Sequence, residues 1–292
     1  MKSSQSQRRR YSIVDSPFFK LKGKGQLARL LKFDINELPA LLHEDNYRVW
    51  TNEKGREIQA PARQLANVHK RIAYLLARIE VPDYVYSQKG RSHIENALQH
   101  VGNSPLIKTD INKFYPSITH GMVTRLFLND FKCAGDVAHT IADICCFQQT
   151  KLPTGSALSG YVAFLAARPM FDQIELLAMK NDTKLTVLVD DVTISGTGAN
   201  RALLLEVRRL VRQSGLSTRG GKSKFYSGSQ PKPVTGAIVV ANGLLLPNRQ
   251  HKKIRQTRNE LVITKPAVRA SLKARLRGQL VAASQVLKHG SN

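Results

Sequence analysis

The stretch "LTVLVDDVTISG", residues 185–196, places two adjacent aspartates, Asp190 and Asp191, in a run of β-branched and apolar residues. Hydrophobic residues alternate on both sides of the pair, which predicts two strands that meet at the aspartates. Such strands gain no stability from two carboxylates at their junction. The pair therefore either forms an Asx turn or performs chemistry.

A third carboxylate, Asp110, ends the strand-like run "PLIKTDI", residues 105–111. In a small antiparallel sheet the ends of two strands can meet, so we expect Asp110 close to the aspartate pair. Three crowded carboxylates repel one another unless cations lie between them. The pattern predicts two Mg²⁺ ions about 3.5–4 Å apart, which would stabilise the attacking and leaving oxygens of phosphoryl transfer.

The chain is strongly basic: its 292 residues include 45 Lys and Arg against 21 Asp and Glu, for a net charge of +24. A field of this size concentrates polyanions, which makes nucleic acid the leading partner; a ribosomal-type binding protein and a binder of anionic membranes are the alternatives. Residues 1–32 and 249–292 contain no acids besides Asp15 and Glu260, so each end could hold a nucleic-acid backbone. The first ten residues could equally form a solvated tail.

Cys133, Cys145 and Cys146 form no C-x-x-C pair and are odd in number, so they predict neither a disulfide framework nor a zinc site. A hydrophobic content of 42% indicates a chain that folds. No apolar run approaches the roughly 18 residues of a membrane span, and no apolar segment follows the basic N-terminus. We therefore expect a cytoplasmic protein with no membrane partner.

Local patterns predict most of the secondary structure. "YRVWTNEKGREIQAP", residues 47–61, predicts a hairpin that turns at residues 52–55. Apolar spacing predicts a long amphipathic helix over residues 65–79, and Ser92 with Glu95 forms a capping box that begins another. Further helices are expected over 119–129, 135–148, 156–179, 199–213, 249–262 and 267–287, and further strands over 222–227 and 234–246.

Four segments resemble, in order, motifs A to D of reverse transcriptases. They are "TDINKFYPSI" (109–118), "LPTGSALSG" (152–160), "LVDDVTISG" (188–196) and "GLSTRGGKSKF" (215–225). "NALQH" (96–100) and "VTGAIVVANG" (234–243) are similar to the N-A-x-x-H and V-T-G elements of retron reverse transcriptases, and the resemblance extends to residues 16–31 and 275–287. Other bacterial defence-associated and group II intron-like reverse transcriptases are the nearest alternatives.

The resemblance implies a role for each residue at a motif position. Asp110 and Asp190 would bind two Mg²⁺ ions, with Mn²⁺ as a possible substitute. Asp191 would ligate or support these ions, and the carbonyl of Ile111 could add an oxygen. Lys222 would neutralise or protonate the departing pyrophosphate, unless it is a solvated lysine in a turn.

The resemblance also implies a nucleotide site. Tyr115 would lie beneath the incoming sugar and favour dNTPs over rNTPs; without the motif it would be an ordinary core tyrosine. Arg56 would hold the triphosphate, since its planar fork suits phosphate oxygens. Pro153 and Gly155 would form the turn into the next helix and let its backbone approach nucleotide and template.

Contacts to RNA are expected from two regions. Asn96 and His100 lie four residues apart on one helix face, so they would contact RNA together or support the local architecture. The basic C-terminal helices would hold the RNA-containing duplex by its shape and phosphates. The residues expected there are Arg249, Lys252, Lys253, Arg255, Arg275 and Arg277.

Two positions depart from the family pattern. Leu188 stands where motif C usually has tyrosine, which alters the expected support of the primer terminus and removes no metal ligand. Thr154 stands where motif B commonly has glutamine, which weakens the expected side-chain contact to the nucleotide. Both changes leave the chemistry in place and put rate and fidelity in question.

The expected architecture is a mixed α+β fold of the right-hand polymerase type, with an antiparallel-sheet palm that carries the catalytic aspartates. A basic segment, 1–19, would precede fingers (20–104 and 119–150), palm (105–118 and 151–240) and a helical thumb (241–292). No residues would remain for an RNase H domain after the thumb, so a host RNase H would remove the template.

The resemblance implies an RNA-directed DNA polymerase that uses dNTPs and a structured non-coding RNA as template and primer. Priming from a guanosine 2′-hydroxyl would give a branched RNA-linked single-stranded DNA (msDNA), which would join the enzyme and a separate effector protein in antiphage defence. The alternative from another class is a non-catalytic RNA-binding scaffold that retains the polymerase fold.

Overall fold

The computed structural model describes residues 10–263 and 266–290. Contacts divide the chain into two units. Unit 1 comprises Met1–Pro82, Asn112–Asp172 and Gln213–Leu216, and unit 2 comprises Asp83–Ile111, Gln173–Arg212 and Ser217–Asn292. The first nine residues of the basic segment predicted over 1–19 lie outside the described residues.

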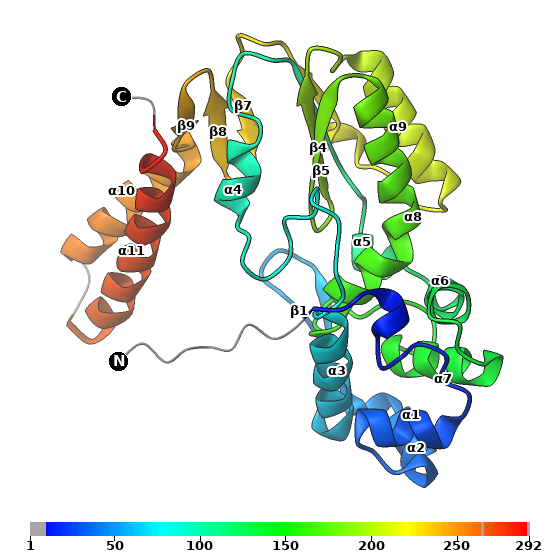
Figure 1. Cartoon of the computed structure of the whole chain (residues 1–292). Coiled ribbons are helices and arrows are strands. Elements are labelled where there is room, and N and C mark those ends of the chain that lie inside the picture. The colour runs from blue at the N-terminus through cyan, green and yellow to red at the C-terminus, as the bar shows by residue number, and fades with distance from the viewer. Residues whose placement is uncertain (1–9, 264–265, 291–292) are drawn as a thin grey trace, which may run out of the picture. The chain divides into compact units, whose positions relative to one another are not determined.

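Unit 1 is mainly helical and contains one two-stranded sheet (Figure 1). Its elements are α1 (Lys24–Leu31), α2 (Leu38–Leu41), β1 (Tyr47–Thr51), β2 (Glu57–Pro61), α3 (Arg63–Leu76), α5 (Phe114–Ser117), α6 (His120–Arg125), a π-helical turn (Leu126–Asp130), α7 (Gly135–Cys145) and α8 (Ser159–Lys180) as far as Asp172. Short 3₁₀ turns lie at Ile13–Asp15, Ile35–Glu37 and Glu44–Asn46.

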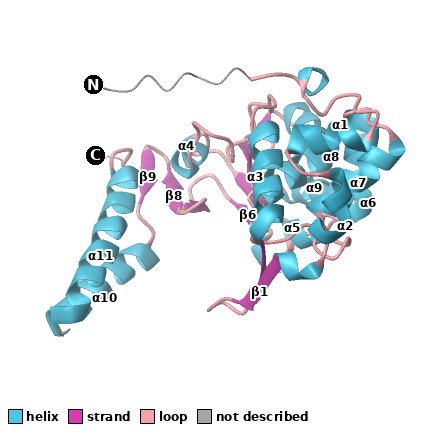
Figure 2. Cartoon of the chain, turned by 90° about the horizontal axis from the view of Figure 1, so that it is seen from below, coloured by secondary structure: helices cyan, strands magenta, loops and turns pink. Residues whose placement is uncertain are grey.

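The hairpin predicted over residues 47–61 is confirmed as β1 and β2, with Tyr47 opposite Pro61. Its turn is fixed by Asn52, whose side-chain oxygen accepts hydrogen bonds from the backbone N–H groups of Lys54 (2.9 Å) and Arg56 (3.1 Å). The tip lies away from the helices of this unit (Figure 2). Basic and apolar side chains at the hairpin are therefore exposed.

Unit 2 contains two antiparallel sheets (Figure 1). The first has the strand order β4–β5–β3–β6 and the second the order β7–β8–β9. The strands are β3 (Leu106–Asp110), β4 (Thr183–Leu188), β5 (Asp191–Gly196), β6 (Lys224–Tyr226), β7 (Lys232–Val234), β8 (Ala237–Val240) and β9 (Gly243–Leu245). The helices are α4 (His93–Leu98), the remainder of α8 from Gln173, α9 (Arg201–Gln213), α10 (Asn248–Ile263) and α11 (Pro266–Leu287), with a 3₁₀ turn at Gly220–Lys222.

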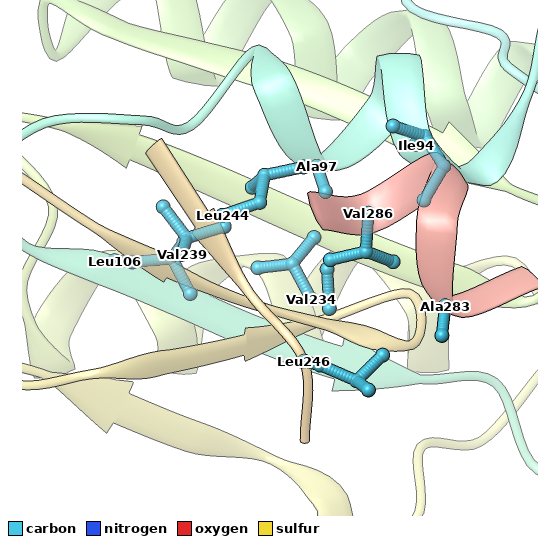
Figure 3. Close-up of a cluster of buried hydrophobic side chains, with 10 residues drawn as sticks. Ile94, Ala97, Leu106, Val234, Val239, Leu244, Leu246, Ala283 and Val286 are labelled. Atoms are coloured by element: carbon cyan, nitrogen blue, oxygen red, sulfur yellow. The ribbon is translucent and has the colours of Figure 1, made fainter. Parts of the chain in front are cut away.

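A hydrophobic cluster joins α4, both sheets and the end of α11 (Figure 3). Every member is at most 6% exposed, so the cluster removes a continuous apolar surface from water. Its residues are Ile94, Ala97, Leu106, Val234, Ala237, Val239, Leu244, Leu246, Ala283 and Val286. The C-terminal turns of α11 are thereby anchored to the strands that precede it.

Helices α10 and α11 lie side by side (Figure 1). Arg275 on α11 joins them, because its guanidinium donates to the Thr257 hydroxyl (3.0 Å) and to the Glu260 carboxylate (2.7 Å) on α10. Thr257 is the buried residue of α10, whereas the basic side chains around it are exposed. The pair presents a long, basic, solvent-facing surface.

Most predicted elements are present, and several end where local geometry changes. The capping box of Ser92 and Glu95 is confirmed at the start of α4. The helix predicted over 135–148 ends at Cys145, and Gln148 and Gln149 then adopt left-handed backbone angles (φ 47° and 53°). The helix predicted over 119–129 widens into a π-helical turn after residue 125, for which the sequence gives no signal.

The predicted mixed α+β fold with antiparallel sheets is confirmed. The boundaries of fingers, palm and thumb stay a prediction. Contacts divide the chain into two units, and the limits of these units do not coincide with those boundaries. In the parts of the chain that the structure describes, no helix is both long and apolar enough to cross a membrane.

The cluster predicts unequal effects of two neighbouring leucines in β9. Leu244 is 0% exposed and Leu245 is 42% exposed. Leu244→Ala should lower the free energy of unfolding by about 2–5 kcal/mol, because it leaves a cavity among packed side chains. Leu245→Ala, the matched control, should change it by no more than about 0.5 kcal/mol. Urea unfolding followed by circular dichroism measures both, and equal effects would contradict the assigned packing.

Candidate active site

Antiparallel pairing brings two of the predicted aspartates together in unit 2. Strands β3 and β5 pair so that Asp110 lies directly opposite Asp191. Leu188 pairs with Asp191, so only Val189 and Asp190 form the turn between β4 and β5. The N–H of Ile111 donates to the carbonyl of Asp190 at 2.9 Å, which ties this turn to the end of β3.

The turn itself is strained. Val189 has a φ of +60°, a left-handed conformation that is rare for β-branched residues. Such conformations cost about 1–3 kcal/mol and concentrate at functional sites. The strain at Val189 supports a functional interpretation of the adjacent aspartates over a simple Asx turn.

Three basic side chains surround the carboxylates. Lys222 Nζ lies 2.6 Å from Asp110 Oδ2, and Arg219 Nε lies 3.5 Å from Asp110 Oδ1. Lys108 Nζ lies 2.8 Å from Asp191 Oδ2. Lys222, which the sequence assigns to the departing pyrophosphate, thus lies beside Asp110, while Lys108 and Arg219 are basic neighbours not predicted from the sequence. The three cations reduce the repulsion between the buried carboxylates.

The carboxylates are perturbed by burial and by one another. Asp110 is 5% exposed. Burial, and then the charge of Asp110, raises the pKa of the Asp190 carboxyl above its usual value. Burial also raises the pKa of Asp191, and the neighbouring Lys108 opposes that rise. A bound divalent cation would lower these pKa values, because it favours the ionised carboxylates.

Two carboxylate oxygens are suited to a metal ion. Oδ1 of Asp110 and Oδ1 of Asp191 are buried and have no hydrogen-bond partner among the described residues, although the ion pair with Arg219 Nε reaches Asp110 Oδ1 at 3.5 Å. Among the described residues, the three aspartates do not form a group whose ligand atoms all lie within 4.8 Å of one another, and Lys108 and Lys222 each hold one carboxylate oxygen. The donor set, made of carboxylate oxygens and a nearby carbonyl at Ile111, fits a hard cation such as Mg²⁺.

Asn96 and His100 are both buried, and His100 contacts the sheet that carries the aspartates. His100 Nδ1 lies 2.7 Å from the Ser195 hydroxyl and its Nε2 lies 2.7 Å from the Thr186 hydroxyl, so the ring bridges β5 and β4. Burial, together with the charges of nearby lysines, lowers the pKa of His100 to about 3, so the ring is neutral. Asn96 is 0% exposed and His100 3% exposed, which favours the architectural role of the pair over contact with RNA.

The predicted nucleotide-binding residues belong to unit 1. Arg56 is exposed near the tip of the β1–β2 hairpin. Tyr115 is half-buried in α5, and its hydroxyl lies 3.4 Å from the position that a Cβ at Gly160 would occupy. Gly155 donates its N–H to the Gln59 carbonyl at 3.0 Å, and a Cβ there would lie 2.8 Å from the same oxygen. The close approach that Gly155 permits in this structure is therefore to β2.

The segment from Pro153 to Gly155 is fastened to β2 through Thr154. The Thr154 hydroxyl lies 2.9 Å from the Glu57 carbonyl oxygen and 3.0 Å from Gln59 Oε1. The Thr154 N–H also donates to Gln59 Oε1 at 3.1 Å. Gln59 is 2% exposed, so its side chain is buried in this contact with Thr154. Thr154, which stands where the family commonly has glutamine, thus connects the start of the α8 segment to β2.

The basic residues expected on the C-terminal helices are all exposed. Arg275 is held by Thr257 and Glu260 across the two helices. The full set is Arg249, Lys252, Lys253 and Arg255 on α10, and Arg275 and Arg277 on α11.

Sequence reasoning missed Lys108, Arg219 and Gln59. A signal existed for Lys108, because residues two apart in a strand share a face and Lys108 precedes Asp110 by two. Arg219 and Gln59 meet Asp110 and Thr154 across more than 90 residues of chain, so no local pattern connects them.

Comparisons with known proteins point to one family. Residues 36–256 match the family model described as "Reverse transcriptase (RNA-dependent DNA polymerase)". The chain is 29% identical over 150 residues to the Retron Se72 reverse transcriptase of Salmonella heidelberg (strain 579083-10), a match covering 49% of this chain and 38% of that protein.

Two relatives from Escherichia coli match over longer ranges. The Retron Ec48 reverse transcriptase is 23% identical over 275 residues, covering 86% of this chain and 66% of the relative. The Retron Ec86 reverse transcriptase is 22% identical over 244 residues, covering 78% of this chain and 75% of the relative. The chain therefore spans less than two thirds of the length of the first two of these three relatives.

Lys108 is expected to lower the pKa of the Asp191 carboxyl. Lys108→Met removes the charge that opposes the burial of this carboxylate, so the pKa of Asp191 should rise further. Carbon-13 NMR titration of the labelled aspartates in metal-free protein measures the change. Lys184→Met, at the far end of β4, is the matched control and should leave the titration of Asp191 unchanged. An Asp191 pKa that is the same in Lys108→Met as in the wild type would contradict the ion pair between Lys108 and Asp191.

His100 is expected to make folding sensitive to acid. Its pKa is about 3 in the folded protein and 6.5 for the unperturbed ring, so the folded state binds fewer protons between these values. The wild type should therefore lose stability as the pH falls from 6.5 towards 3, and His100→Gln should lose less. Chemical unfolding across this pH range tests the difference. His93→Gln, at an exposed position of α4, should retain the wild-type slope.

Proposed function

Because the chain belongs to the reverse transcriptase (RNA-dependent DNA polymerase) family, we propose that it copies RNA into DNA at Asp110, Asp190 and Asp191. The observation that carries the proposal is the register of β3 and β5, which sets Asp110 opposite Asp191 next to the turn that holds Asp190. The two buried oxygens without hydrogen-bond partners support it.

The reaction proposed is attack of a primer hydroxyl on the α-phosphate of a dNTP, with pyrophosphate as leaving group. Asp110 and Asp190 would hold two Mg²⁺ or Mn²⁺ ions, with Asp191 as ligand or support and the Ile111 carbonyl as a further oxygen. The ions would supply charge stabilisation to the attacking and leaving oxygens. The protein's own contribution is to fix the backbone positions of the carboxylates through β-sheet pairing, so that binding of the ions would require the side chains to turn and not the strands to move.

Basic and aromatic side chains would complete the nucleotide site. Lys222 has a side chain that is 51% exposed, which leaves it able to turn towards a departing pyrophosphate and neutralise it. Arg56, exposed and planar, would hold the triphosphate. Tyr115 would stand beneath the sugar and disfavour a 2′-hydroxyl, and Pro153 and Gly155 would shape the start of α8 beside it.

The substrate proposed is a retron's own structured non-coding RNA. The relatives named as retron reverse transcriptases and the segments "NALQH" and "VTGAIVVANG" support this assignment. Priming from a guanosine 2′-hydroxyl would give branched msDNA in the cytoplasm, and a host RNase H would trim its template. With a separate effector protein, the product would act in antiphage defence.

The exposed basic residues of α10 and α11 would hold the RNA–DNA duplex. Arg249, Lys252 and Lys253 begin the surface on α10, and Arg277 continues it on α11. Contacts of this kind act on phosphates and release counterions, so binding should weaken steeply as salt rises. They would fix the position of the duplex without reading its sequence.

The decisive experiment uses Asp190→Asn together with Asp191→Asn in the full chain, expressed with its genomic flank. Polymerase activity on a primed RNA template should fall at least about 100-fold, because several kcal/mol of charge stabilisation depend on these carboxylates. Asp182→Asn is the matched control: Asp182 lies just before β4 in a left-handed conformation that asparagine also adopts, so activity should stay at the wild-type level.

The nucleic acid that copurifies with the wild type identifies the substrate. A single short DNA that is joined to RNA and released by debranching enzyme would support the retron assignment. Heterogeneous DNA would favour another bacterial defence-associated or group II intron-like enzyme. Biological activity that persists in the double variant without any DNA product would favour the RNA-binding scaffold and sink the catalytic proposal.

A further inference from the structure

Helices α6 and α7 of unit 1 bring two histidines and an aspartate together. His120 Nε2 lies 2.9 Å from Asp143 Oδ1, and His139 Nε2 lies 3.9 Å from the same oxygen. One ligand atom from each of the three residues lies within 4.8 Å of the other two. None of these residues is among those proposed above for metal, nucleotide or RNA binding.

These separations are close to those of a zinc site. Zn²⁺ binds histidine nitrogen at about 2.0–2.1 Å and carboxylate oxygen at about 2.0–2.2 Å, so ligand atoms of a tetrahedral site lie roughly 3.3–3.5 Å apart. The separations of 2.9 Å and 3.9 Å lie on either side of that range. His139 can make the remaining adjustment, because its side chain is 64% exposed while those of His120 and Asp143 are 17% and 18% exposed.

A second contact orients the ring of His120. The Thr124 hydroxyl donates to the His120 carbonyl at 3.0 Å, so its oxygen can accept from the ring at Nδ1, 3.5 Å away. A proton on Nδ1 leaves the lone pair of Nε2 facing the Asp143 carboxylate. In that tautomer Nε2 and Asp143 Oδ1 are two acceptors 2.9 Å apart, which repel unless a metal ion or a further proton lies between them; in the other tautomer Nε2–H donates to the carboxylate. An outer hydrogen bond to the non-ligating nitrogen is also the usual arrangement at histidine metal sites.

The chemistry of the donors selects the ion. Within the described residues, the group of ligand atoms that lie close together contains no thiol, because Cys146 is not a member of it. Two imidazoles and one carboxylate remain, with water as a fourth ligand. This set suits zinc better than magnesium or calcium, which prefer oxygen.

We propose that His120, His139 and Asp143 bind one Zn²⁺ ion, which fastens the start of α6 to α7. Asp143 and His139 are one turn apart on α7, and His120 is the first residue of α6. Cysteine counting cannot find such a site, because it contains no cysteine.

The test is a zinc titration by calorimetry on the full chain, with excess Mg²⁺ present to occupy the aspartates of the catalytic site. The wild type should bind one zinc ion per chain. His139→Ala should weaken that binding at least about 100-fold, since even outer contacts at metal sites contribute 10- to 100-fold. Asp110→Asn should bind zinc like the wild type, which separates this site from the catalytic carboxylates.

His43→Ala is the matched control. His43 pairs with Asp45 at 3.3 Å, and within the described residues these two belong to no group of three possible ligands. It should leave zinc affinity unchanged. A tetrahedral visible spectrum with Co²⁺, present in the wild type and absent in both His139→Ala and His139→Asn, would confirm the geometry.

Wild-type protein that binds no zinc, or His139 variants that bind it as tightly as the wild type, would overturn the proposal. In that case His120 and Asp143 form an ordinary ion pair. The polymerase proposal would be unaffected, because its test depends on Asp190 and Asp191.

Discussion

The pairing of β3 with β5 in a single register is the constraint on which the candidate active site depends. Because strand side chains alternate between faces, a slip of one residue would turn Asp110 away from Asp191. The register also places Lys108 on the same face as both carboxylates, where it offsets part of the cost of burying them. The two carboxylates, which repel one another, are thus held together by the pairing of the backbone.

The register is secured from the other end of the strand. Leu106, four residues before Asp110 on β3, lies in the hydrophobic cluster with α4 and α11. His100 on the segment after α4 bridges β4 and β5 through two hydroxyls, which resists sliding between the strands that flank the turn. The alignment of the aspartates therefore depends on buried side chains that lie away from the carboxylates. One of these groups is a hydrogen-bonded neutral histidine and the other is a cluster of apolar side chains.

Features that depend on neighbouring residues could be predicted from the sequence. The hairpin at residues 47–61, the capping box at Ser92 and the strands around Asp190 all follow from local patterns, and the structure contains them. The partners of Asp110 and Thr154 could not be predicted, because Arg219 and Gln59 reach them across long stretches of chain. Helical spacing placed Asn96 and His100 on one face, but spacing does not show whether that face turns towards water or towards a sheet.

The contact between Thr154 and Gln59 has a consequence for how this part of the chain can vary. Gln59 supplies one side-chain oxygen to both the hydroxyl and the N–H of Thr154, and the missing side chain of Gly155 lets the two backbones approach. The β1–β2 hairpin and the segment that precedes α8 are therefore fastened to each other by side-chain and backbone contacts. A longer side chain at position 154 would need a shorter or differently shaped one at position 59. We therefore expect substitutions at the two positions to depend on each other, although 95 residues separate them.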